Sequence, residues 1–334
     1  MAQGAAYAGR VPLTVAELDE TELIARFAPR LPRGVRTPVG TGDDAAVLRF
    51  DRGDAVVTTD VLVEDHHFRR RWSSGADVGW RAAMQNLADV AAMGAVPRSL
   101  VVSLVMPPDL PVDWVIDLAD GLAQACAPHE VGVVGGDLSA GPSVMVSVTA
   151  LGELDGVAPV LRSGARAGDQ VACAGTLGRA AAGFALLELA DSGVVLPDSV
   201  KGLVGAFRRP TPPLGAGVDA ARSGATAMLD LSDGLLRDAG RVARASGVGI
   251  ELSSRLLGPE AEALQEAAEI AGIAEMDWVL GGGEDHGLLA TFPASAALPA
   301  EFRRIGRVRD AVGHAVTIDG EPPSVRVGWD HFSG

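Results

Sequence analysis

The alternation of short apolar strands with amphipathic helices is the feature that most restricts the fold of this chain. In the first half it predicts the order ββαβαββ, which is typical of one compact α+β domain of about 150 residues. A chain of 334 residues exceeds the size at which a single hydrophobic core usually stops growing, so we expect a second domain. The expected strands of the first half are 45–48, 55–59, 100–106, 131–134 and 144–150, and its expected helices are 17–27, 77–93 and 112–127.

The segment 161–169, which contains two glycines and two arginines, marks the expected change of domain. After it the alternation continues in an α/β pattern. We therefore expect a tail without fixed structure over 1–15, an N-terminal α+β domain over 16–152 and a C-terminal α/β domain over 153–334. The expected strands of the second half are 170–174, 227–231, 249–252, 287–292, 304–308 and 316–318, and its expected helices are 178–190, 234–246 and 260–271.

The charge of the chain excludes several classes of partner. The formal net charge is −15, whereas nucleic-acid binding needs a basic face, so DNA or RNA is not expected as a partner. Lys201 is the only lysine, which rules out a Walker A phosphate loop. Cys126 and Cys173 lie outside any C-x-x-C pattern, and no apolar run reaches membrane-spanning length, so we expect a cytoplasmic protein with reduced thiols.

A subset of the aspartates lies beside glycines at the ends of the apolar strands, rather than among basic residues on a solvated face. Ligands gather at strand ends in folds of this class, and glycine lets a backbone approach a phosphate closely. Hard cations such as Mg²⁺ prefer carboxylate oxygens together with waters and substrate phosphates. The pattern therefore predicts a magnesium and phosphate site. Its members are Asp43, Asp44, Asp60, Asp137, Asp230 and Asp233.

Three further features have two interpretations each. Asp89 lies inside an apolar helix, where it is either exposed on a polar face or a metal ligand. Ser232 and Asp233 either cap the following helix or place its N-terminus against a phosphate. The run 281–283 of three glycines before two acidic residues indicates a ligand loop rather than a plain turn.

Taken in order, these motifs resemble those of bacterial thiamine-monophosphate kinases. The resemblance extends over residues 17–332, and the ordered set is far more specific than any one motif. One departure is His286-Gly287, where the family usually carries Tyr or Phe. The matching motifs are Gly42-Asp43-Asp44, Thr58-Thr59-Asp60, Asn86-Leu87-x-Asp89, Gly135-Gly136-Asp137, Arg162-Ser163-Gly164, Asp230-Leu231-Ser232-Asp233-Gly234, Gly283-Glu284-Asp285 and Trp329-Asp330.

The resemblance implies a PurM-like architecture, in which a ferredoxin-like α+β domain dimerises and an α/β domain follows. This fold is shared with aminoimidazole ribonucleotide synthetase, selenophosphate synthetase and a hydrogenase maturation factor. It implies a homodimer whose ATP site lies between the two domains, at or near the dimer interface. The implied reaction is phosphorylation of thiamine monophosphate by ATP with several Mg²⁺ ions.

The resemblance also implies a role for each matching residue. The implied metal ligands are Asp44, Thr58, Thr59, Asp60, Asp89, Asp137, Asp230 and Asp233, of which Asp89, Asp137 and Asp233 are taken as catalytic. The implied ATP contacts are Gly136, Asp137, Arg162 and Ser232, and the implied contacts to thiamine monophosphate are His67, Glu284 and Trp329.

Other interpretations of the same residues stay open. The chain could be another ATP-using enzyme of the same fold, although Cys126 sits too late in a helix for the selenophosphate branch. It could instead be an idle ATP-binding dimer with a regulatory role, yet all the carboxylates that the motifs require are present. A metal-dependent phosphohydrolase would bring histidines among its aspartates, and these clusters are almost free of them.

Overall fold

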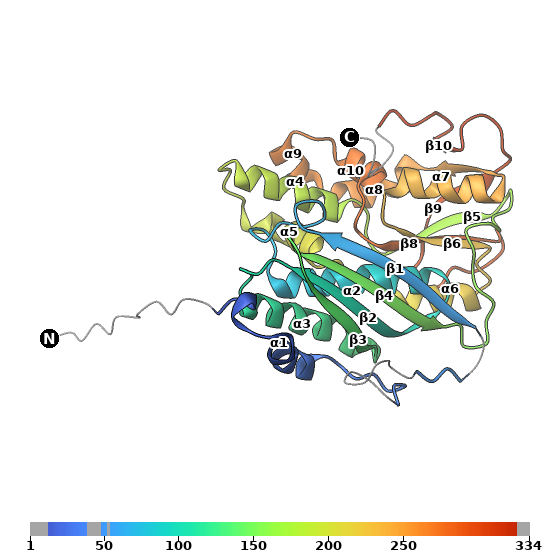
Figure 1. Ribbon diagram of the computed structural model, residues 1–334. Helices are drawn as coiled ribbons and strands as arrows, with labels where there is room; N and C mark the ends of the chain where they lie inside the picture. The colour runs from blue at the N-terminus through green and yellow to red at the C-terminus, as the bar shows by residue number, and fades with distance from the viewer. Residues whose placement is uncertain (1–12, 39–47, 52–53, 326–334) are drawn as a thin grey trace.

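The computed structural model describes residues 13–38, 48–51 and 54–325, which form two β-sheets with helices packed on them (Figure 1). The first sheet has the strand order β1-β4-β2-β3 and the second has the order β10-β7-β9-β5-β8-β6. The elements of the first half are α1 (Glu20–Phe27), β1 (Ala55–Val63), α2 (Gly75–Ala92), β2 (Val96–Met106), α3 (Val112–Cys126), β3 (Gly132–Ala140) and β4 (Met145–Glu153).

Helix α2 connects the two halves of the molecule. It begins at the N-cap Ser74, whose side chain accepts a hydrogen bond from the Asp77 amide while the Asp77 carboxylate accepts one from the Ser74 amide. Most of its residues are buried on every side, because it packs on β1 and β4 and also on α6 and β6 of the second half. A helix that is buried on every side lies in the middle of a protein, and the polar residues of α2, among them Arg81 and Gln85, are buried with it.

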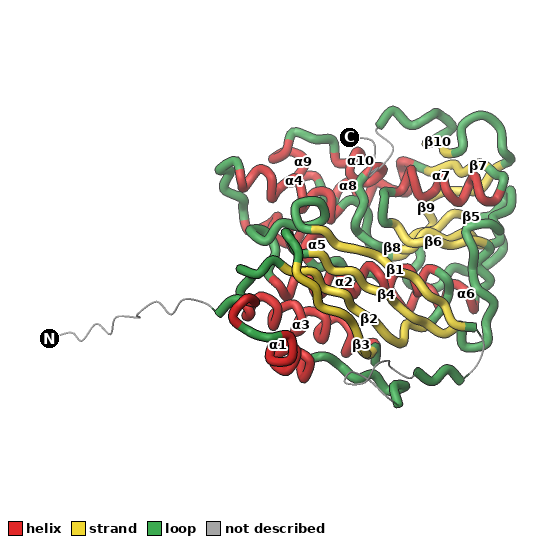
Figure 2. Tube along the Cα trace, viewed as in Figure 1, coloured by secondary structure: helices red, strands yellow, loops and turns green. Residues whose placement is uncertain are grey.

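The opposite face of the first sheet is open. Helices α2 and α3 lie behind its strands, and no other element of the described chain lies in front of them (Figure 2). Apolar side chains on this face are exposed to solvent, with 62% of Val57, 36% of Val61 and 37% of Met145 accessible. Exposed apolar side chains on an uncovered sheet face of this kind indicate an interaction surface.

The second sheet is mixed, because β7 and β10 are parallel whereas its other four neighbouring pairs are antiparallel. Its central strands β5 and β8 are fully buried and therefore lack polar alternation. The elements of this half are β5 (Gln170–Ala174), α4 (Arg179–Asp191), α5 (Lys201–Arg208), α6 (Leu214–Arg222), β6 (Ala227–Leu231), α7 (Leu235–Ser246), β7 (Gly249–Leu252), α8 (Ser254–Glu262), α9 (Gln265–Ala271), α10 (Glu275–Gly281), β8 (Gly287–Phe292), β9 (Arg303–Arg309) and β10 (Val316–Ile318).

Most of the expected elements are found, and several differ in extent. Strands β1, β2 and β3 are longer than expected because polar residues and glycines continue their ladders. The single helix expected over 260–271 is two helices, α8 and α9, which are interrupted at 263–264. Helices α5, α6 and α10 were not expected from the sequence.

Some expectations fall wholly or mainly outside the described residues. The strand at 45–48 does so except for Leu48, which is not in a strand. Of the tail at 1–15, only 13–15 are described, and there the Leu13 carbonyl accepts a hydrogen bond from the Val112 amide. The domain boundary at 152–153 stays a prediction, with the first sheet ending at Glu153. No helix in the described ranges is long and apolar enough to cross a bilayer.

Candidate active site

A cleft of about 420 Å³ lies between the two sheets, and its volume is in the range of small-molecule sites. One wall is the beginning of β1 together with the end of α2, and the facing wall is β6 with the segment 159–162. Four of the predicted site residues line this cleft, namely Thr58, Asp89, Arg162 and Asp230. The structure therefore brings together residues that lie far apart in the sequence.

Asp89 is the electrostatic centre of the cleft. Its carboxylate accepts a hydrogen bond from the Thr58 hydroxyl, with an oxygen–oxygen distance of 2.9 Å. Burial, followed by repulsion from Asp230 and Asp60, raises the pKa of Asp89 to about 7. The interpretation of Asp89 as an exposed residue on a polar helix face is therefore wrong, because Asp89 is half-buried and the polar residues on the same side of α2, Arg81 and Gln85, are buried.

The end of β6 and the turn that follows it carry two of the predicted aspartates, Asp230 and Asp233. Asp230 is 5% exposed at the end of β6. Asp233 forms an ion pair with Arg241, and its amide donates to Asp238 at 3.0 Å. The capping interpretation of Ser232 and Asp233 is wrong, because the N-cap is Gly234, at φ 106°, with no side-chain cap.

The glycine-rich loop after α10 places His286 against Asp230 of the cleft and Glu284 next to His286. Glu284 and His286 have left-handed backbones, at φ 70° and 52°, which is uncommon for residues other than glycine. The His286 ring lies between two carboxylates, with Nδ1 3.4 Å from Asp230 and Nε2 3.4 Å from Glu284. Burial lowers the pKa of His286, but these carboxylates outweigh it and raise the pKa to about 10.

Two of the predicted metal ligands, Thr59 and Asp137, lie on the open face of the first sheet. Thr59 and Val61 share the open face of β1, and Asp137 reaches that face through the pairs Val61–Ser147, Ser147–Ser103 and Ser103–Asp137. Asp60 points to the opposite face. Because β3 is three strands from β1, Asp137 is about 14 Å from that strand. The described chain thus does not bring Asp137 to Asp89.

The remaining predicted residues have varied positions. His67 follows β1, and its Nδ1 accepts a hydrogen bond from the Val63 amide at 3.0 Å. Gly136 is required by strand packing, because a Cβ there would lie 1.9 Å from the Val102 carbonyl oxygen. Asp44 and Trp329 lie outside the described residues.

Sequence reasoning missed Arg81, Asp238, Arg241 and the network around His286. Asp238 is 0% exposed, and its Oδ1 lies 2.6 Å from Arg241 Nη1. A charged pair at i and i+3 near the start of an amphipathic helix was the available signal, although such pairs are usually solvated. Arg81 carried no local signal, since its partner Glu284 is two hundred positions away.

The donor chemistry of the cleft fits Mg²⁺. No three Asp, Glu, His or Cys side chains within the described ranges form a ready-made metal cage. Mg²⁺ does not need one, because it keeps several waters and uses one or two carboxylates with substrate phosphates. Asp89 is surrounded by like charges that raise its pKa, and a divalent cation among these oxygens would relieve that repulsion.

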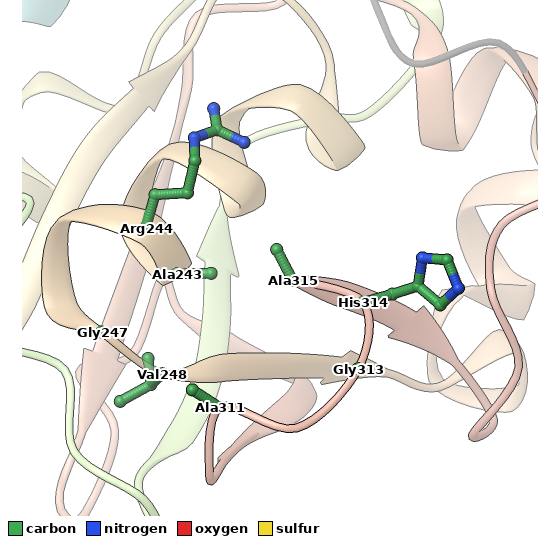
Figure 3. A pocket seen from close by; sticks show the side chains of 8 residues that line it. All are labelled: Ala243, Arg244, Gly247, Val248, Ala311, Gly313, His314 and Ala315. Atoms are coloured by element: carbon green, nitrogen blue, oxygen red, sulfur yellow. The ribbon is translucent and has the colours of Figure 1, made fainter.

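A second hollow of about 210 Å³ lies between the C-terminal end of α7 and residues 311–315 (Figure 3). Figure 3 shows Arg244 and His314 on opposite sides of a lining that otherwise consists of alanine, glycine and valine. None of the predicted site residues lines it. The cleft between the sheets is therefore the candidate active site.

Comparison with known proteins gives matches over nearly the whole chain. The family described as AIR synthase related protein matches through its N-terminal domain at residues 42–154 and its C-terminal domain at 166–319. A protein of Mycobacterium tuberculosis named thiamine-monophosphate kinase is 44% identical over 326 residues, which cover 96% of this chain and 93% of that protein.

Two solved structures extend the comparison to the fold. The structure described as AaThiL complexed with AMPPCP and TMP has a TM-score of 0.77 at 34% identity, covering 98% of this chain and 100% of that one. The hydrogenase maturation protein HypE in complex with ATP has a TM-score of 0.70 at 20% identity, covering 94% and 92%. The expected fold, an α+β domain followed by an α/β domain and shared with a hydrogenase maturation factor, is confirmed.

Proposed function

Because this chain belongs to the thiamine-monophosphate kinases of the AIR synthase related family, we propose that it phosphorylates thiamine monophosphate with ATP. The products are ADP and thiamine diphosphate. The observation that carries the proposal is the cleft in which Thr58 of the first sheet, Asp89 of helix α2 and Asp230 of the second sheet converge. A similar protein, AaThiL, is complexed with AMPPCP and TMP, an ATP analogue and the proposed acceptor.

The proposed reaction depends on neutralising the negative charges of the two substrates more than on a general base. The acceptor is a phosphate oxygen that is already ionised near neutral pH, so no residue has to remove its proton. The barrier comes from bringing two polyanions together with their oxygens in line. Mg²⁺ bound in the cleft would supply that neutralisation and orientation. We assign Asp60, Asp89 and Asp230, with the Thr58 hydroxyl, as the residues that would hold it.

Other residues would bind and orient the two substrates. Arg162 lines the cleft and carries the positive charge suited to the phosphates of ATP. Ser232 and Asp233 belong to the turn beside the cleft, where Asp233 is held by Arg241. His67, Glu284 and Trp329 remain the proposed contacts to thiamine monophosphate, and Gly136 and Asp44 keep the roles that the family motifs imply.

We also propose that the protein is a homodimer formed through the open face of the first sheet. Val57, Val61 and Met145 would be buried against the same face of a second copy, as in other isologous interfaces. Thr59 and Asp137 lie on this face and would then belong to the interface, which is where the family motifs place part of the ATP site. The buried free thiols Cys126 and Cys173 support work in the reducing cytoplasm.

The test is ADP release from Mg-ATP by the purified protein, with and without thiamine monophosphate, while thiamine diphosphate is followed by chromatography. We expect one thiamine diphosphate for each ADP, and no ADP without the acceptor. ATP binding without turnover would instead support the alternative of an ATP-binding regulatory dimer. ADP formation with another phosphorylated acceptor, but not with thiamine monophosphate, would contradict the proposed substrate.

A further inference from the structure

Arg81 carries a buried charge that the proposed reaction does not yet explain. It projects from the middle of α2, and its side chain is 3% exposed. Burying a guanidinium is costly unless its charge and its donors are matched. The contacts of Arg81 therefore indicate its role.

The partners of Arg81 lie in the other half of the molecule. Nη2 donates to Glu284 Oε2 at 2.7 Å, and Nη1 donates to the Phe207 carbonyl oxygen at 3.4 Å. The guanidinium also stacks over the Phe207 ring, 4.6 Å from its centroid. Nε is buried without a hydrogen-bond partner, so the position of the guanidinium is set by Glu284 and Phe207.

Glu284 is held from one side only. Arg81 and His286 both approach the same oxygen, Oε2, while 35% of the side chain stays exposed. Burial would raise the pKa of Glu284, but Arg81 and His286 lower it, so the carboxylate is ionised. Its backbone is fixed in the left-handed region by a hydrogen bond from its amide to the Ser232 carbonyl, at 2.9 Å.

We infer that Arg81 is a positioning residue, which fixes Glu284 across the junction of the two halves with Oε1 turned toward the substrate. The inference rests on the proposed function, because it takes Glu284 as a contact to thiamine monophosphate. Arg81 does not touch the substrate itself. Its effect reaches the substrate through the orientation and charge of Glu284.

The matched control is Arg209, which has the same kind of contacts at the same junction. Its Nε lies 2.5 Å from Asp77 Oδ1, and its guanidinium lies 5.9 Å from the Trp80 ring centroid. Asp77 and Trp80 belong to α2, as Arg81 does, but Asp77 belongs to the N-terminal cap of that helix. Arg209→Met therefore removes a similar ion pair without disturbing Glu284.

The experiment measures the KM for thiamine monophosphate, the KM for ATP and kcat, together with calorimetric binding of thiamine monophosphate alone. For Arg81→Met we expect weaker binding and a higher KM for thiamine monophosphate by about tenfold to a hundredfold, the effect of losing a charged hydrogen bond. The KM for ATP should change by less than about twofold, and Arg81→Lys should recover part of the loss. Arg209→Met should leave both KM values unchanged.

A double variant separates positioning from general stabilisation. With Glu284→Gln present, Arg81→Met should add little to the loss of affinity, because both changes act through one contact. Equal increases in both KM values, or a lower melting temperature with unchanged affinity for thiamine monophosphate, would overturn the inference. If wild type forms thiamine diphosphate and Arg81→Met binds normally, only this inference fails. If wild type neither binds nor phosphorylates thiamine monophosphate, the proposed function fails with it.

Discussion

Replacing Asp89 by asparagine should stabilise the metal-free protein at alkaline pH while it removes most of the activity. The pKa of this carboxyl is raised from 3.8 to about 7 by burial, Asp230 and Asp60. A carboxyl with a raised pKa carries no penalty below its unfolded pKa, where it is neutral in both states. The penalty grows as the pH rises through the window between the two values and is complete above the folded pKa.

The size of the effect follows from that shift. A difference of about 3 pKa units corresponds to at most about 4 kcal/mol, at about 1.36 kcal/mol per unit. Asp89 is partly accessible, so solvent screening reduces this to about 1–2 kcal/mol. Asparagine keeps the shape of the side chain and an oxygen that can accept the Thr58 hydrogen bond. The melting temperature should therefore rise by a few degrees at about pH 8 and be unchanged at about pH 4.

The assay is thermal unfolding of wild type and Asp89→Asn in EDTA at several pH values, repeated with Mg²⁺ and AMPPCP. Mg²⁺ should stabilise wild type more than the variant at high pH, because a bound cation requires the ionised carboxylate. The variant should lose at least about a hundredfold in kcat at saturating Mg²⁺. A variant less stable than wild type at about pH 8, or a difference independent of pH, would refute the electrostatic argument. Near-normal kcat would remove Asp89 from the metal site.

Three further changes test other parts of the site. Asp137→Asn should lose most of the turnover with an unchanged melting temperature, because the carboxylate is exposed; normal kcat at saturating Mg²⁺ would count against its metal role. Arg241→Met should raise the KM for ATP by about tenfold, since Asp233 loses the ion pair that holds the turn beside the cleft, and an unchanged KM for ATP would contradict this. Val57→Glu should yield monomers in light scattering, whereas Val195→Glu, at a 93% exposed position away from the sheet, should not; a Val57→Glu dimer would exclude the open face as the interface.

The elements that local pattern predicted best are the fully buried strands of the second sheet. Strands β5, β6 and β8 have the expected bounds, because burial on both faces gives short, mainly apolar runs, in which Gln170, Asp230 and Thr291 are the polar exceptions. Helix α2 was also predicted closely, since Gly94 follows its end. Helices α5, α6 and α10 are only 7–9 residues long, so their periodicity is too short to distinguish from a loop.

The sequence identified the carboxylates of the site as one group but could not show which of them lie close together in space. Asp60 and Thr59 are neighbours in the chain and lie on opposite faces of one sheet, because successive side chains of a strand alternate. Asp89 and Asp230 are far apart in the chain and repel each other across the cleft. The family motifs contain all four of these residues, but a motif specifies residue types and not the directions in which side chains point. The resemblance therefore could not show that Thr59 and Asp60 diverge whereas Asp89 and Asp230 face each other.

The sequence by itself thus determined the two-domain fold, the family and the oxygen-rich chemistry of the site, because these depend on local periodicity and on motifs in a fixed order. The tertiary structure decided which groups face one another. The pairing of β1 with β4, about ninety positions later, sets the face of Asp60, and the packing of α2 against the second half joins Arg81 to Glu284. Such contacts arise from the burial of whole elements against each other, which no short stretch of sequence encodes.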